Sequence, residues 1–178
     1  MALPPVVSVV GKSGSGKTVF LEKLVTVLKS RRLRIGIIKH DPHGFDVDQP
    51  GKDSWRHAQA GSDVVVLSSP TKLAVIRRLD GEMTLDAIVN AYLPDVDLVI
   101  TEGYKRGPKK KIEVSRREKS RELISPPEDL IAIVTDQTFN LPVPQFGLDE
   151  VKEVADFIMQ RFLGSNGEVV NEDPADGD

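Results

Sequence analysis

The sequence predicts an α/β fold: a mainly parallel, twisted sheet flanked by helices, with an added antiparallel β-hairpin. Two observations predict it. Short runs rich in β-branched residues alternate with stretches of helical periodicity along the chain, and the first such run leads through a glycine-rich turn into a helix. The length of 178 residues is close to that of one domain. We therefore expect one domain over residues 1–163, followed by a tail.

The expected strands are short apolar runs. Residues 6–10 are β-branched throughout apart from one serine, which is typical of a strand buried on both faces. The runs at 64–67 and 72–79 are separated by Ser-Ser-Pro-Thr and predict a hairpin. Further strands are expected at 34–39, 97–101, 110–115 and 130–134.

The expected helices are recognised by apolar stripes and by capping residues. Residues 17–30 carry apolar side chains at helical spacing. Asp53 and Ser54 are expected to cap a short helix that Gly61 ends, and Thr84 to open another. In addition to the helix at 17–30, helices are expected over 53–60, 84–92 and 148–162.

The composition excludes several classes of site. The chain has no cysteine, which rules out disulfides, thiolate zinc sites and cysteine nucleophiles and fits a cytoplasmic protein. The N-terminal segment has no basic region, so we expect a core strand there and no signal peptide. No apolar run approaches the roughly 20 residues that span a bilayer. Residues 164–178 hold five carboxylates and no basic residue, and we expect them to be disordered.

Residues 11–18, Gly-Lys-Ser-Gly-Ser-Gly-Lys-Thr, match the phosphate-binding pattern G-x-x-x-x-G-K-[ST]. The glycines let the backbone curl so that its N–H groups point at phosphates, and the helix that follows adds the positive end of its dipole. Lys17 should reach the terminal phosphates, and the Thr18 hydroxyl should bind magnesium. We expect the loop as a whole to bind a purine nucleoside triphosphate: Gly11, Lys12, Ser13, Gly14, Ser15, Gly16, Lys17 and Thr18. The chain is thus predicted to be a P-loop NTPase.

Lys12 permits two interpretations. A lysine directly after the first glycine marks a subclass of P-loop ATPases that act as dimers, in which it reaches the nucleotide of the partner subunit. Ser13 stands where that subclass usually has glycine. An exposed lysine near the phosphates is the interpretation that we favour.

Glu102 and Asp136 are expected at the edge of the sheet that binds ligands, because ligands of parallel sheets lie at the carboxyl ends of the strands. Glu102 closes its strand and is a candidate for magnesium binding or water positioning, with Lys17 as the other candidate catalytic residue. Asp97 opens the same strand and is expected to be structural. Asp136 follows a later strand, where GTPases place an aspartate that binds guanine, but the lysine-containing part of that motif is absent. A capping role is the alternative for both Glu102 and Asp136.

The segment after the second strand is rich in polar side chains. It is either a ligand loop that contacts magnesium, phosphates or a second substrate, or a solvated turn. Zinc binding by two of its histidines is a third alternative. The candidates are Lys39, His40, Asp41, His43, Asp46 and Asp48, with Asp41 a possible magnesium ligand.

Residues 104–121 are strongly basic. They hold nine lysines and arginines against two glutamates, a net charge of +7, while the whole chain has −3. The segment is suited to an anionic second substrate, an acidic partner or nucleic acid, or it is a solvated, mobile loop. Nucleic acid is the less favoured partner because Tyr104 is the only aromatic residue available for stacking.

Two runs of residues resemble a known family. Residues 38–54, Ile-Lys-His-Asp-Pro-His-Gly-Phe-Asp-Val-Asp-Gln-Pro-Gly-Lys-Asp-Ser, resemble a signature of the molybdopterin-guanine dinucleotide biosynthesis adaptor family, MobB. The run from Asp97 to Lys105, with its Glu-Gly-Tyr-Lys end, resembles a strand of the same family. The likeness covers roughly residues 5–163, so it excludes the acidic tail.

The resemblance implies a homodimer that binds GTP with magnesium and is at most a slow GTPase. It implies an adaptor role beside a guanylyltransferase that joins GMP to molybdopterin, with molybdopterin or its guanine dinucleotide as a further ligand. It also implies that His40, Asp41, Asp46, Asp48 and Asp53 line the site. Two other functions remain open: a P-loop small-molecule kinase with an arginine lid, and a metal-delivery GTPase, against which the lack of cysteine counts.

Overall fold

The computed structural model describes residues 3–164, and the predicted tail lies outside them except for Gly164. These residues form two compact units, one made of residues 3–40 and 89–164 and the other of residues 41–88. Each unit is described by itself below. The expectation of a single domain over 1–163 therefore stays a prediction.

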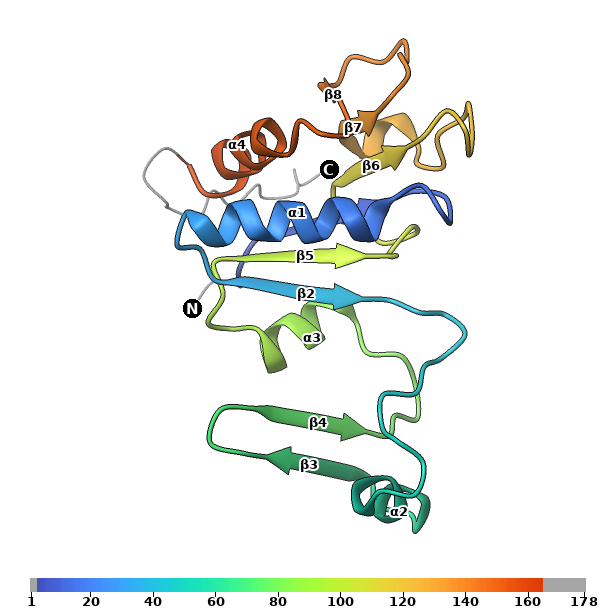
Figure 1. The fold of residues 1–178 in the computed structure, drawn as a ribbon, viewed down its shortest axis with the longest axis vertical. Helices are drawn as coiled ribbons and strands as arrows, with labels where there is room; N and C mark the ends of the chain where they lie inside the picture. Colours follow the sequence, from blue (N-terminus) through green and yellow to red (C-terminus); the bar gives the residue numbers. More distant parts are fainter. Residues whose placement is uncertain (1–2, 165–178) are drawn as a thin grey trace, which may run out of the picture. The chain divides into compact units, whose positions relative to one another are not determined.

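The first unit is built on a six-stranded sheet in the order β2-β5-β1-β6-β7-β8, in which every neighbouring pair is parallel (Figure 1). The predicted parallel sheet is confirmed. The two residues of β8 were not predicted, since so short a strand has no pattern. The strands are β1 (Val6–Val10), β2 (Ile35–Lys39), β5 (Leu98–Glu102), β6 (Lys111–Ser115), β7 (Leu130–Thr135) and β8 (Gln145–Phe146).

Helices α1 (Lys17–Ser30) and α4 (Val151–Phe162) share one core cluster with the sheet. Leu24 of α1 and Ile158 of α4 are fully buried in it. The predicted start of α4 at residue 148 was three residues early, because Glu150 accepts a hydrogen bond from the Gly147 amide at 2.7 Å and closes a turn there. Within residues 3–164, no helix combines the length and apolar character needed to cross a bilayer.

The second unit contains α2 (Asp53–Gln59) and the antiparallel pair β3 (Val64–Ser68) and β4 (Leu73–Arg77), which confirms the predicted hairpin. Helix α3 (Leu85–Tyr92) follows, and the Ala87 amide donates to the Thr84 hydroxyl at 3.2 Å, as a Thr cap requires. The predicted capping of α2 is wrong. Asp53 is its first helical residue, Lys52 holds the cap position without a side-chain bond, and Ser54 donates to Asp48 at 3.1 Å instead.

Strand β6 changes the interpretation of the basic segment 104–121. All five of its residues are buried between β1 and β7, so the segment is not one solvated loop but two loops joined by a core strand. Lys111 is 1% exposed and is neutralised by Asp129 at 2.6 Å, and it also donates to the Gly107 carbonyl at 2.8 Å. A buried lysine needs such partners. The charge available to a ligand is therefore carried by the two flanking loops.

Candidate functional site

The predicted phosphate loop lies between the end of β1 and the start of α1. Gly11, Gly14 and Gly16 have φ angles of +150°, +75° and +88°, values that glycine adopts easily and other residues rarely. A Cβ atom on Gly11 would lie 2.3 Å from the Val114 carbonyl oxygen, so this glycine is also required for space. The loop leads into the N-terminal turn of α1, whose first amides have no partner within the helix. This geometry suits an anion.

Lys17 spans the loop. Its ammonium group donates to the carbonyl oxygens of Gly11 at 3.0 Å and Lys12 at 2.8 Å. Burial lowers the pKa of Lys17 below its ordinary value; the negative charge of Glu102 opposes this shift and the positive charge of Lys105 adds to it. The cation is thus held inside the loop, where a phosphate group would meet it.

Thr18 and Glu102 come together as the magnesium prediction requires. The Thr18 hydroxyl donates to a Glu102 carboxylate oxygen at 3.0 Å. The parallel register of β5 with β1 pairs Glu102 with Val9 and so places it beside the loop. Gly103 follows with φ +101°, and a Cβ atom there would lie 2.6 Å from the His40 carbonyl oxygen. Glu102 therefore offers a carboxylate oxygen for a metal ion, and Gly103 lets the backbone after β5 pass close to the backbone at His40.

Asp97 lies at the opposite end of β5. It accepts hydrogen bonds from the Arg34 amide at 2.6 Å and from the Arg34 guanidinium at 3.1 Å. Partial burial alone would raise the pKa of Asp97, but the bonds from Arg34 outweigh it and lower that pKa. The structure agrees with the structural role expected for Asp97.

The loop after β6 lies against the phosphate loop, which the sequence did not predict. The Lys12 ammonium donates to the Ser120 hydroxyl at 2.6 Å. The Arg116 guanidinium lies about 3.1 Å from the place where Gly16 would carry a Cβ, and Lys119 about 3.4 Å from the same point on Gly14. Lys12 is therefore half-buried and bound within its own chain. Its predicted contact with nucleotide stays a prediction.

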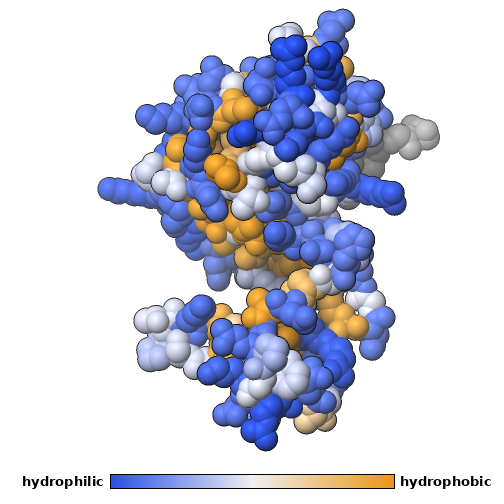
Figure 2. Space-filling view, turned by 45° about the vertical axis from the view of Figure 1, so that its right-hand side comes forward, coloured by the Kyte–Doolittle hydropathy of each residue, from blue (hydrophilic) through white to orange (hydrophobic). Residues whose placement is uncertain are grey.

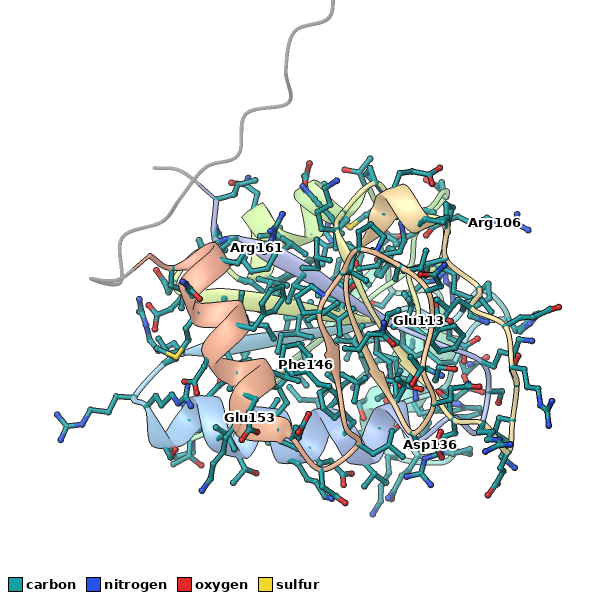
Figure 3. The ribbon with its side chains drawn as sticks, turned by 90° about the horizontal axis from the view of Figure 1, so that it is seen from above. Arg106, Glu113, Asp136, Phe146, Glu153 and Arg161 are labelled. Atoms are coloured by element: carbon teal, nitrogen blue, oxygen red, sulfur yellow. The ribbon has the colours of Figure 1, made fainter. Side chains whose placement is uncertain are left out.

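Glu113 and Asp136 hold this loop in place. The buried Glu113 carboxylate accepts hydrogen bonds from the amides of Ile124 at 2.8 Å and Ser125 at 2.9 Å, and it lies inside the molecule in Figure 3. Asp136, at the end of β7, accepts from the Arg117 amide at 2.7 Å. Sequence reasoning missed Glu113; its signal was a carboxylate at an expected core position, which must find partners. Asp136 acts here as a turn acceptor, and its guanine role is untested.

The residues predicted after β2 divide between the two units. Lys39 and His40 belong to the first unit, where Lys39 is in register with Glu102 and the His40 ring lies 4.6 Å from that of Tyr104. The remaining candidates lie in the second unit, and their place at the site stays a prediction: Asp41, His43, Asp46, Asp48 and Asp53.

Within the second unit these side chains make local contacts. Asp41 accepts from the His43 amide at 3.0 Å, and Asp48 from the Gln49 amide at 2.8 Å; both bonds are typical of aspartate in turns. Asp53 lies 3.7 Å from Arg56 in an exposed pair. Over residues 3–164, no group of three or more histidine, aspartate or glutamate side chains is placed to hold a metal ion.

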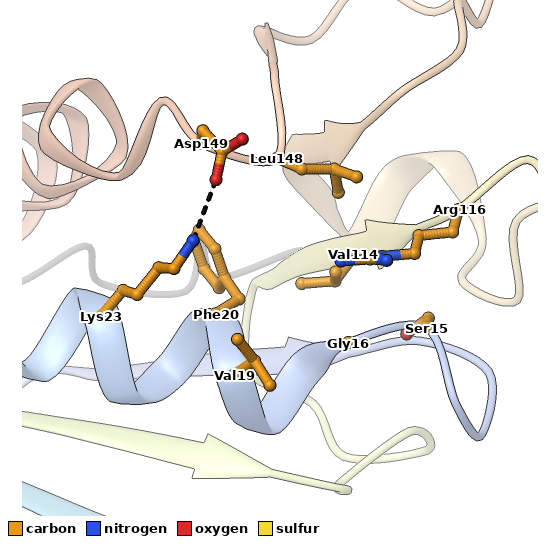
Figure 4. A pocket seen from close by; sticks show the side chains of 9 residues that line it. All are labelled: Ser15, Gly16, Val19, Phe20, Lys23, Val114, Arg116, Leu148 and Asp149. Atoms are coloured by element: carbon orange, nitrogen blue, oxygen red, sulfur yellow. Dashed lines mark hydrogen bonds and ion pairs between the residues drawn. The ribbon is translucent and has the colours of Figure 1, made fainter.

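A cavity of about 280 Å³ adjoins the phosphate loop (Figure 4). It lies between the first turns of α1, the end of β6 and the segment before α4, and the Lys23 ammonium contacts the Asp149 carboxylate at its rim at 2.9 Å. The sequence did not predict it, because its walls are far apart in the chain. It is lined by Ser15, Gly16, Val19, Phe20, Lys23, Val114, Arg116, Leu148 and Asp149.

Comparisons with known proteins agree with this geometry. The family model "Molybdopterin guanine dinucleotide synthesis protein B", MobB, matches residues 6–136. A molybdopterin-guanine dinucleotide biosynthesis adapter protein of Haemophilus influenzae is 35% identical over 155 residues, covering 86% of this chain and 87% of that protein. The Escherichia coli protein of the same name is 33% identical over 169 residues, covering 92% and 96%.

Solved structures give the same result. A crystal structure of molybdopterin-guanine biosynthesis protein B superposes with a TM-score of 0.70 at 34% identity, covering 88% of this chain and 99% of the other. The Bacillus subtilis MobB structure superposes with a TM-score of 0.71 at 27% identity, covering 94% and 99%. The sequence match, the shared fold and the phosphate loop lead to one conclusion: this chain belongs to the MobB family.

Proposed function

We propose that this protein is an adapter in the biosynthesis of molybdopterin guanine dinucleotide and that it binds GTP with magnesium. The family model and the names of the relatives support the pathway. The observation that carries the nucleotide part is the Thr18–Glu102 bond at 3.0 Å beside a glycine-built phosphate loop. A hydroxyl and a carboxylate are oxygen ligands of the kind that magnesium binds together with phosphate oxygens and water.

The phosphates would bind the loop amides of residues 11–18, with Lys17 turning from the two carbonyls it now contacts to the terminal phosphates. Thr18 and Glu102 would hold the magnesium ion, which would offset part of the phosphate charge. The proposal includes at most slow GTPase activity, as the family resemblance implies, with nucleotide binding as the main role.

The flanking loops of β6 suit an anionic partner. Lys105 and Arg106 are exposed in the loop that follows Glu102, and Arg106 extends from the rim of the molecule in Figure 3. Arg116 and Lys119 lie on the phosphate loop itself. These cations would attract the phosphate of molybdopterin, or of its guanine dinucleotide, and an acidic surface of a guanylyltransferase.

A homodimer is part of the proposal. The hairpin of the second unit exposes apolar side chains, of which Leu73 is 65% and Val66 56% exposed, and Figure 2 shows hydrophobic residues at the surface of this unit. Such exposure on a short two-stranded sheet is typical of a surface that another chain covers.

The direct test of the adapter role is co-purification of the full chain with the molybdopterin guanylyltransferase of its own organism. We expect a complex in the presence of GTP and magnesium, and faster attachment of GMP to molybdopterin when the chain is added. If the chain binds neither GTP nor the guanylyltransferase, the proposal fails. Consumption of ATP with a phosphorylated small molecule as product would support a kinase instead.

A further inference from the structure

The 280 Å³ cavity lies on one side of the phosphate loop and the Thr18–Glu102 pair on the other. Strand β1, which leads into the loop, is flanked by β5 on one side and β6 on the other. Glu102 ends β5, whereas Val114 and the segment after β6 line the cavity. A triphosphate on the loop with its terminal group at the magnesium pair would direct its nucleoside toward the cavity.

Two buried polar atoms in the cavity wall lack partners. The Ser15 hydroxyl and the Arg116 Nε are both shielded from solvent and make no hydrogen bond within the part of the chain that the structure describes, and Ser15 as a whole is 1% exposed. Buried polar groups are almost always hydrogen-bonded. Both residues line the cavity, and a small turn of either side chain would bring its unpartnered atom to a polar ligand there.

The remaining walls suit a flat heterocycle with a polar edge. Val19, Phe20, Val114 and Leu148 provide apolar surface. Lys23 and Asp149 place a cation and a carboxylate side by side at the rim (Figure 4). The volume is slightly below the range of about 300–1,000 Å³ found for ligand pockets, which fits a base and part of a ribose but not a whole nucleotide.

We propose that this cavity binds the guanine base of the nucleotide and that Asp149 is the residue that selects guanine. This inference rests on the proposed GTP binding. The Asp149 carboxylate would accept hydrogen bonds from N1–H and the 2-amino group of guanine together, while Lys23 donates to the neighbouring O6. Adenine offers a single amino group on that edge and no adjacent oxygen, so it makes fewer bonds to the same pair.

Asp149 is free to take this role. Its side chain is 91% exposed and that of Lys23 is 52% exposed. Ion pairs this exposed contribute little to stability because water screens them, so the pair can rearrange around a ligand at little cost. Asp136, by contrast, does not line the cavity, and one of its oxygens already accepts from the Arg117 amide at 2.7 Å.

The test compares GTP with xanthosine triphosphate, XTP, in which an oxygen replaces the 2-amino group. In Asp149→Asn the new amide can donate to that oxygen, so we expect GTP affinity to fall at least tenfold and XTP affinity to rise at least tenfold. Asp136→Asn is the matched control and should keep the preference for GTP. Calorimetry on the full chain with magnesium measures both nucleotides against the wild type and the two variants.

The outcomes separate this inference from the proposed function. If no GTP binds to the wild type, both fail. If GTP binding depends on Lys17 but Asp149→Asn keeps the wild-type preference, or if Asp136→Asn switches it, the cavity assignment alone is overturned.

A second variant tests the unpartnered Nε. Arg116→Lys keeps the charge and removes that donor, so GTP and XTP should both weaken by the same factor; unchanged affinities would contradict a ligand at Arg116. A free pterin has the same amino–oxo edge as guanine but no phosphate for the loop, so it should not displace GTP. Displacement by the pterin would overturn the assignment of the cavity to the nucleotide.

Discussion

At the scale of single residues, the site depends on three side chains whose contacts are already made within the protein. Lys17 is bound to two loop carbonyls, and Thr18 is bound to Glu102 at 3.0 Å. These contacts hold the groups near the positions in which phosphate and magnesium would replace them. Preorganisation of this kind lowers the cost of ordering side chains on binding.

Glu102 should determine the effect of magnesium on GTP affinity. Glu102→Gln removes an anionic oxygen ligand, so we expect the gain in GTP affinity that magnesium gives the wild type to shrink by about tenfold or more. Titrations with magnesium and with a chelator measure this gain. Glu153→Gln, an exposed change on α4, is the control and should keep it. An undiminished gain in Glu102→Gln would remove Glu102 from the metal site.

Lys17 should make GTP binding sensitive to pH. Its pKa is lowered mainly by burial, and bound phosphates would raise it again by opposite charge. The complex then holds more protons than the free protein, so affinity should fall as the pH rises through the alkaline range below about 10.4, the ordinary lysine value. Calorimetry in buffers of different ionisation enthalpy detects the proton uptake. The uptake should be absent from Lys17→Ala; equal uptake in both proteins would contradict the prediction.

At the scale of elements, the decisive feature is β6, a core strand that carries two charged side chains. Lys111 is neutralised by Asp129, and Glu113 binds the amides of Ile124 and Ser125. Through Glu113 the strand also sets the path of the loop that lies on the phosphate loop. The element thus connects the packing of the sheet to the arrangement of cations at the site.

Glu113→Gln should loosen this loop. A glutamine amide can accept only one of the two N–H bonds and turns a donor toward the other, so we expect a loss of about 1–3 kcal/mol in the free energy of unfolding. Denaturant unfolding measures the loss, and hydrogen exchange should become faster at residues 124 and 125. Glu118→Gln, an exposed change in the same loop, should alter neither. Unchanged exchange in Glu113→Gln would show that the carboxylate does not hold the loop.

The sequence was informative where a signal is local. The strand at 6–10, the helix at 17–30 and the phosphate loop follow from runs and spacings of adjacent residues, and the structure has all three. The partners of Lys111 and Glu113 could not be predicted, because they follow 11 to 18 positions later and no local pattern links them. The cavity was missed for the same reason, since Ser15 and Asp149 meet only through the fold.

At the scale of the whole molecule, two compact units divide the predicted features between them. The first contains the phosphate loop, Glu102 and the cavity, and the second contains the loop residues from Asp41 to Asp53 and the hairpin. The division agrees with an adapter that binds a nucleotide with one part and offers other surfaces to partners. That function depends first on whether the molecule binds GTP through its loop.

The measurement that tests this most directly is calorimetric titration of GTP and ATP, each with magnesium, into the wild type, Lys17→Ala and Lys152→Ala. Lys17→Ala loses a charge-assisted phosphate contact worth about 1.5–3 kcal/mol, so its GTP affinity should fall at least tenfold. Lys152, exposed on α4, is the matched control and should leave GTP binding unchanged. Tight GTP binding, weak ATP binding and a loss confined to Lys17→Ala are the predicted result. ATP binding as tight as GTP binding, or undiminished binding by Lys17→Ala, would contradict it.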